Sequence, residues 1–596
     1  MCRQPSCASG EDGCGALHLC QQPAMAQQEL FFFSIEDGYP DTHEKNWKQQ
    51  ELEDDNELKR WPTPIEIVEE MKAISRISGP MVLTGLLLYS RAMVSMLFLG
   101  RLGELELAGG SLAIGFANIT GYSVISGLAM GMEPICGQAY GAKRWSLLGI
   151  TLQRTILILL CASVPIAFLW LNMERILLWC GQNEQITQMA GVYITFSLPD
   201  LLAQAFLHPL RIYLRTQNIT IPLTCCATVA VLLHVPINFI LVVYLKMGIR
   251  GVAIAAVWTN LNIVFSLLGY LCLSGVYKKS WEGVSKECLK GWRSLLSLAI
   301  PSCVSVCLEW WWYELMIILC GLLVNPTATL ASMGILIQTT ALVYIFPSSL
   351  SLGVSTRVGN ELGGNRPAKA RIAMIVALLC AGVLGLLAMT FTTTMRHRWG
   401  RMFTQDTDIL QLTSLALPIV GLCELGNCPQ TTGCGVLRGC ARPSTGANIN
   451  LGSFYFVGMP VAILMSFVFN TGFTGLWLGL LAAQASCAAL MLYVLLSTDW
   501  ILQAQRAKDL TGAHQMEHES FKFQETCHKA AHDNHASATA PALALAPATA
   551  PAPAPAHALL NLHDDCSYSD CSDSHPLITV QIAKPEETKL CSESHF

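Results

Sequence analysis

Charged side chains are scarce in this chain. Only 13% of its 596 residues are Asp, Glu, Lys or Arg, whereas 52% are hydrophobic. Polar residues concentrate before about residue 78 and after about residue 500, so the middle is far more apolar than the average. A soluble domain of such composition would not stay in solution, and the central region is therefore predicted to be a membrane protein.

Signature motifs of several classes are also absent. The chain has no HExxH, GxSxG, CxxC or paired intramembrane Asp, which counts against an enzyme, and no GxxxxGK phosphate loop. No basic stretch interleaved with aromatics points to nucleic acid. The first 60 residues lack a basic start followed by an apolar stretch, so we expect no cleavable signal peptide. We expect neither a metal nor a cofactor, and we expect the 24 cysteines to be free thiols.

Twelve apolar runs are long enough to cross roughly 30 Å of hydrocarbon. The sequence therefore predicts an all-α fold with six spans in each of two bundles. The first six lie near 79–99, 107–132, 149–171, 188–208, 221–245 and 251–275. The second six lie near 296–323, 328–354, 372–395, 409–435, 445–469 and 475–498.

The two bundles repeat one another. At a separation of 222 positions, Tyr122 returns as Tyr344, and at 223 positions Leu214-Arg215 returns as Leu437-Arg438. The glycines of 131–141 return in 353–363 in the same way. Six spans per unit make the repeat parallel, an arrangement that transport proteins use to build a central cleft. We interpret the two glycine segments as places of close helix packing and hinge motion.

Basic residues predict the orientation. The loops on one side carry fifteen Lys and Arg, among them Arg215, Arg357 and Arg438, and those on the other carry seven. The positive-inside rule then puts both termini in the cytosol. The membrane stays open at this stage, with the plasma membrane, the vacuole and endosomal or Golgi membranes all compatible.

These boundaries define five regions. We expect a disordered cytosolic segment over 1–60, a first lobe over 61–275, a cytosolic interfacial linker over 276–294, a second lobe over 295–500 and a disordered cytosolic tail over 501–596. A capping box at Thr63 to Glu66 should open a helix on the membrane surface that breaks at Gly79-Pro80. In the linker, Trp281, Val284, Cys288 and Trp292 predict a second interfacial helix. The tail holds His514 with His518, His528 with His532, and a dileucine-like DSHPLI at 573–578, each of which we interpret as an ordinary polar segment.

Glu309, near the middle of the seventh span, is the strongest site candidate. Inside a bilayer an ionisable group is costly, so it predicts a functional site. Burial favours the protonated carboxyl and a nearby cation favours the anion, so such a group can exchange a proton for a solute. Glu314, five residues on, lies on another face of the helix. Trp310 and Tyr313 are candidates for the substrate cavity, through stacking and cation-π contact, although a tryptophan belt at the interface is the alternative.

Other polar residues of the spans complete the candidate set. In the tenth span Glu424 and Asn427 share a face, with Gln430 one turn further, and we expect them to form a cluster with Glu309. In the first lobe, Arg91 and Asp200 are interpreted first as a structural pair and second as transport residues. Asn238, beside His234, is a further cavity candidate, with packing between helices as the alternative.

The motifs resemble those of the multidrug and toxic compound extrusion (MATE) family, in its plant DETOXIFICATION branch. Residues 131–142 (GMEPICGQAYGA) are similar to the family's E-x-x-C-G-Q-A-[YF]-G-A, and residues 307–311, 357–363 and 435–439 match as well. The resemblance covers roughly residues 65–500. It implies two six-helix lobes around a central cavity and cation-coupled export of organic solutes, usually with protons in plants.

The resemblance also assigns residues. Glu309 matches the seventh-helix glutamate of the cation site, while the tenth-helix acid of many relatives falls on Asn427, with Glu424 one turn earlier as its replacement. The first-helix aspartate of many prokaryotic members corresponds to Ser95. The resemblance therefore implies that proton coupling lies in the second lobe.

The sequence thus predicts a monomeric, multi-pass antiporter that exchanges protons for a small organic solute. The alternative is a lipid or solute flippase, or a conduit of similar architecture, that works without a cation gradient. A third hypothesis is a receptor or scaffold that acts through its tails. It predicts that deletion of residues 505–596 abolishes function.

Overall fold

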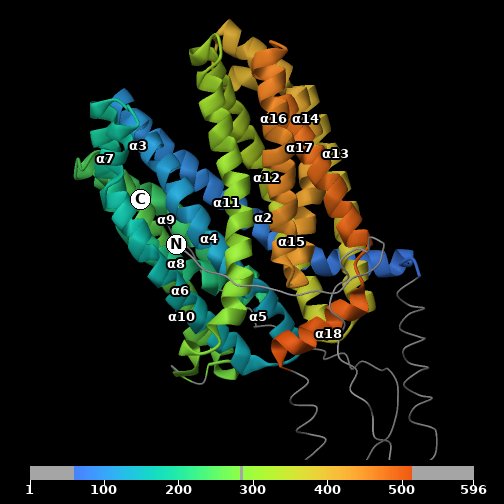
Figure 1. Cartoon of the computed structure of the whole chain (residues 1–596). Helices are drawn as coiled ribbons and strands as arrows, with labels where there is room; N and C mark the ends of the chain where they lie inside the picture. The colour runs from blue at the N-terminus through green and yellow to red at the C-terminus, as the bar shows by residue number, and fades with distance from the viewer. Residues whose placement is uncertain (1–59, 282, 284–285, 513–596) are drawn as a thin grey trace, which may run out of the picture. The chain divides into compact units, whose positions relative to one another are not determined.

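The computed structural model describes residues 60–281, 283 and 286–512, and the secondary structure of these residues is helical throughout (Figure 1). The first lobe contains α2 (Pro64–Leu102), α3 (Glu104–Ala117), η1 (Asn118–Tyr122), α4 (Ser123–Met130), α5 (Met132–Gly141), α6 (Trp145–Leu171), α7 (Met173–Trp179), α8 (Glu184–Thr216), α9 (Ile221–Asn238), η2 (Phe239–Tyr244) and α10 (Ile249–Ser274). The linker contains η3 (Val276–Lys279) and η4 (Lys286–Leu289). The second lobe contains α11 (Trp292–Gly321), α12 (Pro326–Gly363), α13 (Pro367–Met395), η5 (Gly400–Met402), α14 (Thr407–Gly439), α15 (Pro443–Asn450), η6 (Leu451–Gly458), α16 (Met459–Ile463), η7 (Leu464–Val468) and α17 (Phe473–Leu496), followed by α18 (Trp500–Thr511).

The described part of the chain contains 12 helical segments long and apolar enough to cross a membrane. Each one overlaps a predicted span, which confirms the all-α polytopic fold. Three spans are built from consecutive helices, namely α3 to α5 (Glu104–Gly141), α9 with η2 (Ile221–Tyr244) and α15 to η7 (Pro443–Val468).

The repeat is visible in the backbone. Gly248 and Gly472, at corresponding positions of the two lobes, precede α10 and α17 with φ of 60° and 59°. Lys143 and Asn365, another corresponding pair, both have positive φ, 57° and 56°. Because non-glycine residues rarely adopt this conformation, the coincidence shows that the two lobes fold alike and confirms the internal repeat.

Each lobe has its own apolar core, and α2 and α11 each contribute to both. Leu295 and Leu298, at the start of α11, belong to the first core, whereas Trp312 further along α11 belongs to the second. Conversely, Ile74 of α2 belongs to the second core. The beginnings of the first and seventh spans therefore pack on the opposite lobe.

The predicted break at Gly79-Pro80 is wrong, because α2 continues through Pro80. Thr63 caps the helix in the predicted capping box. Proline removes the N–H that would bond the carbonyl of Arg76. The hydroxyl of Thr220, at the start of α9, donates to that carbonyl at 3.3 Å and so replaces the lost hydrogen bond. A partner from another helix thus keeps α2 intact.

The predicted interfacial helix of the linker is also wrong. Its described residues form only the short 3₁₀ turns η3 and η4. Gly275, Gly283 and Gly291 have φ of 66°, 99° and 71°, which a right-handed helix does not accommodate. Cys288 is buried as expected, whereas Trp281 is 38% exposed and Val284 lies outside the described residues.

The predicted boundary of the tail at residue 500 is wrong as well. Asp499 caps α18 by accepting from the Leu502 N–H at 3.0 Å. Trp500, Ala504 and Ala507 of α18 join the second core. The predictions for residues 1–59 and 513–596, including the tail histidines and DSHPLI, lie outside the described residues.

Candidate functional site

The two glycine segments pack against each other across the lobes. A Cβ added to Gly137 of α5 would lie 3.5 Å from the Cα of Gly359 of α12. A Cβ on Gly141 would collide with the backbone carbonyl of Asn360, and one on Gly363 with that of Gln138. The prediction of close helix packing is confirmed, and the contact joins the first lobe to the second.

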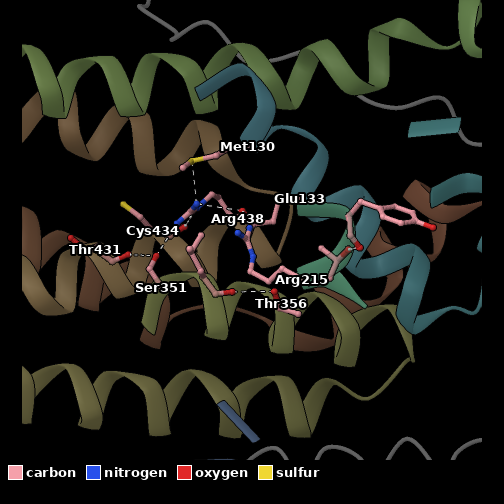
Figure 2. A network of polar contacts seen from close by, with 11 residues as sticks. Met130, Glu133, Arg215, Ser351, Thr356, Thr431, Cys434 and Arg438 are labelled. Carbon is pink, nitrogen blue, oxygen red and sulfur yellow. Dashed lines mark hydrogen bonds and ion pairs between the residues drawn. The ribbon is translucent and has the colours of Figure 1, made fainter. Parts of the chain in front are cut away.

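Beside this contact, two arginines converge on one buried glutamate (Figure 2). Glu133 of α5 is 1% exposed. Its Oε2 lies 2.9 Å from Nη2 of Arg215 on α8 and 3.4 Å from Nη1 of Arg438 on α14. Arg215 and Arg438 occupy corresponding positions of the repeat, one in each lobe. We call this group the Glu133 bridge, since it links the lobes by charge.

Further polar contacts hold Arg438 and its surroundings. Its Nη2 donates to Oγ of Ser351 at 2.7 Å, and Ser351 in turn donates to the carbonyl of Thr431 at 2.7 Å (Figure 2). Gln138 donates across the lobes to the carbonyl of Gly439 at 2.9 Å. The arginine head group is therefore fixed between the lobes.

A second ionic group lies near the end of α12. Arg357 donates to Glu70 of α2 at 2.8 and 2.9 Å, and it pairs with Glu361 at 2.9 Å. Glu361 also pairs with Arg366. Arg215, Arg357 and Arg438, which the orientation prediction counted as loop residues, thus lie inside helices and engage buried carboxylates.

Glu309 faces a cavity of about 60 Å³. The cavity lies among α4, α11, α12, α14 and α15, and Tyr344 and Arg438 also line it. The Tyr344 hydroxyl and the Arg438 guanidinium therefore share this cavity with the Glu309 carboxyl. However, no ion pair joins Glu309 to Arg438 among the described residues. The carboxyl is thus inside the protein at a cavity, and an arginine does not lock it.

The polar residues of the tenth span form a connected set. Nδ2 of Asn427 donates to Oε2 of Glu424 at 2.8 Å, and Nε2 of Gln430 donates to Asn450 at 3.3 Å. Asn450 donates to Ser305, a cavity residue, at 3.1 Å. The carboxyls of Glu309 and Glu424 are close enough that their negative charges would repel each other. Thr431, which lines the cavity, donates to Oδ1 of Asn427 at 3.2 Å, so hydrogen bonds connect Glu424 to the cavity that Glu309 faces.

The aromatic run of α11 divides between different surroundings. Tyr313 lies within electrostatic reach of both Glu309 and Glu424. Trp310 is 38% exposed and does not line the cavity. Trp312 is fully buried and packs against Phe454 with ring centroids 5.6 Å apart. Neither of the two predicted aromatic cavity residues, Trp310 and Tyr313, lines the cavity at Glu309.

The first-lobe candidates lie apart from this cavity. Asn238 is fully buried and donates to His234 at 2.9 Å, and His234 contacts Ser95 at 3.0 Å, so this set packs between α2 and α9. Asp200 accepts from Asn260 of α10 at 2.7 Å. Arg91 acts on Asp200 electrostatically but forms no ion pair with it among the described residues. The two predicted partners thus interact by charge without a direct ion pair between them.

No group of three or more His, Cys, Asp and Glu side chains that could hold a metal gathers within residues 60–281, 283 and 286–512. The role of Glu133 was not predicted, because this residue was noted only as part of the motif at 131–142. The signal that could have found it was the recurrence of Arg215 as Arg438. Two related cations near a pseudo-twofold axis need an anion close to that axis.

Comparison with known proteins agrees with this architecture. The MatE family model matches residues 80–240 and 301–464. Protein DETOXIFICATION 48 of Arabidopsis thaliana is 69% identical over 472 residues, which cover 79% of this chain and 89% of the relative. Protein DETOXIFICATION 49 of the same plant is 65% identical over 444 residues, covering 74% and 88%.

Solved structures show the same fold. The crystal structure of the eukaryotic MATE transporter AtDTX14 is similar with a TM-score of 0.72 and 31% identity, over 75% of this chain and all of that one. The Vibrio cholerae MATE transporter VcmN in its bent form aligns with a TM-score of 0.64 at 17% identity, over 75% of this chain and 99% of that one. Family model, sequence relatives and fold agree: this chain belongs to the multidrug and toxic compound extrusion (MATE) family of membrane transporters, in its plant DETOXIFICATION branch.

Proposed function

We propose that the chain exports or sequesters an organic solute in exchange for protons, by alternating access of its two lobes. The observation that carries the proposal is Glu309 at its cavity, beside Tyr344 and with Arg438 near but not paired. A carboxyl in such a site can hold a proton in one state and give it up in another. Glu424, held by Asn427, supplies a second carboxyl in the same cluster.

The alternating motion would work at the contact between α5 and α12. Glycine backbones in close contact can separate without breaking interlocked side chains, and the Glu133 bridge adds charge attraction to the closed arrangement. Opening at this end would release Arg438 from Glu133. Arg438 also lines the Glu309 cavity. Its movement would therefore link the opening of the α5–α12 contact to the charge environment of the Glu309 carboxyl.

The rest of the proposal follows from the sequence. We propose that the α5 end of the lobes and both termini face the cytosol, because the loops expected on that side carry more basic residues than those on the other. We propose that the protein works as a monomer and needs no cofactor besides the proton gradient. Which cellular membrane holds it is left to localisation of a fluorescent fusion.

Glu309→Gln tests the proposal in proteoliposomes that contain the full chain. With an imposed pH gradient, efflux of a cationic probe (ethidium) or an anionic probe (carboxyfluorescein) is measured. Glu314→Gln is the matched control, because Glu314 lies on the same helix outside the cavity. We expect Glu309→Gln to abolish gradient-driven efflux and Glu314→Gln to retain it. Full efflux in Glu309→Gln contradicts the assigned role, and wild-type efflux that persists after the gradient is collapsed favours the flippase.

A further inference from the structure

One face of α8 carries a row of polar side chains inside the first lobe. Asp200, Gln204, His208, Arg211 and Arg215 follow one another at spacings of three or four residues, so they lie along the same side of the helix. Gln204 donates to Asp200 at 3.3 Å, and Arg215, at the other end, joins the Glu133 bridge. The row therefore runs from the middle of α8 to the contact between the lobes.

Two arginines, one in this row and one facing it from α2, lack a hydrogen-bonding partner among the described residues. Arg211 of α8 and Arg91 of α2 make no hydrogen bond or ion pair with any other residue that the structure describes, and the Nε of each is buried without an acceptor. Both side chains are nevertheless partly exposed. Their positive charges are close enough to repel each other, and each attracts the carboxylate of Asp200.

Among the described residues, Asp200 is the carboxylate that interacts with both arginines, and one negative charge cannot neutralise two positive ones. Asp200 is 4% exposed and already accepts hydrogen bonds from Asn260 and Gln204. The other arginine of the row, Arg215, is neutralised separately by Glu133. The interior of the first lobe therefore carries an excess of positive charge. An unpaired cation within a membrane span is costly, so such groups face a ligand or a water-filled space.

The internal repeat identifies the position of the second lobe that corresponds to Arg211. Arg215 corresponds to Arg438, and both reach the same Glu133 oxygen, which confirms the register of α8 against α14. In that register Arg211 corresponds to Cys434, which lines the Glu309 cavity. Arg211 thus occupies the first-lobe counterpart of a cavity-lining position. The two lobes differ in charge there, because the second offers Glu309 and Glu424 and the first offers two arginines.

We propose that Arg91 and Arg211 form a binding site for the acidic group of the transported solute, a carboxylate or another organic anion. This assignment of substrate class rests on the proposed function of solute export. Guanidinium groups present planar, paired donors that match a carboxylate, and such charge-assisted hydrogen bonds are about twice as strong as neutral ones. Proton exchange remains with the acids of the second lobe.

Equilibrium binding to the purified full chain in detergent tests the site without any gradient. The probe is carboxyfluorescein, followed by its anisotropy, with benzoate as competitor and benzyl alcohol as the uncharged control. We expect benzoate to displace the probe and benzyl alcohol not to. Arg91→Gln and Arg211→Gln should each weaken probe binding at least tenfold. The control Arg250→Gln should bind as the wild type does, because Arg250 lies over the Phe196 ring, 5.6 Å away, and belongs to neither site.

Probe affinities within twofold of the wild type in both Gln variants would overturn the proposal. Should a Gln variant fail to fold, as judged by gel filtration, the Lys variant at that position keeps the charge but loses the planar fork. It is expected to bind more than threefold more weakly, and unchanged affinity would again overturn the proposal. The binding and transport experiments together show whether the anion site or the proposed proton exchange has failed. Probe binding without gradient-driven transport refutes proton exchange alone, whereas gradient-driven ethidium efflux with wild-type probe affinity in both Gln variants refutes the anion site alone.

Discussion

Removing the charge of Glu133 should open the contact between the lobes. In Glu133→Gln, Arg215 and Arg438 remain close together without an anion between them. Breaking a buried ion pair from one side costs roughly 3–5 kcal/mol. Only part of this acts on the opening, because Arg215 lies in the same lobe as Glu133 and their pair, at 2.9 Å, does not depend on the lobe contact. The longer pair with Arg438, at 3.4 Å, is the part that opening would break.

We therefore expect a shift toward the open arrangement of about 1.4 kcal/mol or more, which is tenfold in the equilibrium constant. Amide hydrogen exchange followed by mass spectrometry measures it, since exchange in a closed contact reports the population of its open form. Peptides that cover residues 131–144 and 353–366 should exchange at least tenfold faster in Glu133→Gln than in the wild type.

Two controls make this result specific. Glu184→Gln changes an exposed glutamate at the opposite end of α8 and should leave exchange unchanged. The double variant Glu133→Gln with Arg438→Gln removes the stranded cation as well, and it should exchange more slowly than the single variant. Exchange within twofold of the wild type in both segments of Glu133→Gln would refute the bridge as a latch between the lobes.

Three further changes test the architecture. Gly363→Ala places a methyl group against the backbone carbonyl of Gln138, so it should force α5 and α12 apart and raise exchange in the same two segments; unchanged exchange would contradict the close contact. Thr220→Val leaves the carbonyl of Arg76 without its donor and should lower stability by about 1–3 kcal/mol, measured as a lower Tm in detergent, whereas an equal Tm would show that the helix does not need this hydrogen bond. Asp499→Ala removes the cap of α18 and should cost about 1 kcal/mol, seen as faster proteolysis within 500–511, and wild-type resistance would argue against the docked helix.

The sequence predicted those features that depend on local patterns. Spans follow from apolar length, the repeat from recurring residues such as Tyr122 and Tyr344, and the choice of Glu309 as a site candidate from the expense of charge in a membrane. Features that depend on distant partners were not predicted. Whether α2 breaks at Pro80 is decided by the hydroxyl of Thr220 on another helix.

Three other predictions were wrong: the helix of the linker, the loop position of two arginines and the boundary of the tail. The spacing of apolar residues in the linker favoured a helix, but three glycines with positive φ interrupt it. Arg215 and Arg438 were predicted to lie in loops. Only the packing of α8 and α14 around α5 showed that they share Glu133. Tail composition suggested disorder from residue 501, whereas the apolar face of α18 packs on the second core. For the same reason, a tail deletion that tests a scaffold role should begin after Gly512.

If Glu309 exchanges protons for solute, solute movement through the wild type must be accompanied by proton movement in the opposite direction. Proteoliposomes with equal pH on both sides receive a gradient of whichever probe the wild type transports, and a trapped pH-sensitive dye reports the lumen. We expect the wild type and Glu314→Gln to move protons against the direction of the solute, and Glu309→Gln to move none. Solute flux in the wild type without any pH change, or proton flux that persists in Glu309→Gln, would contradict the account.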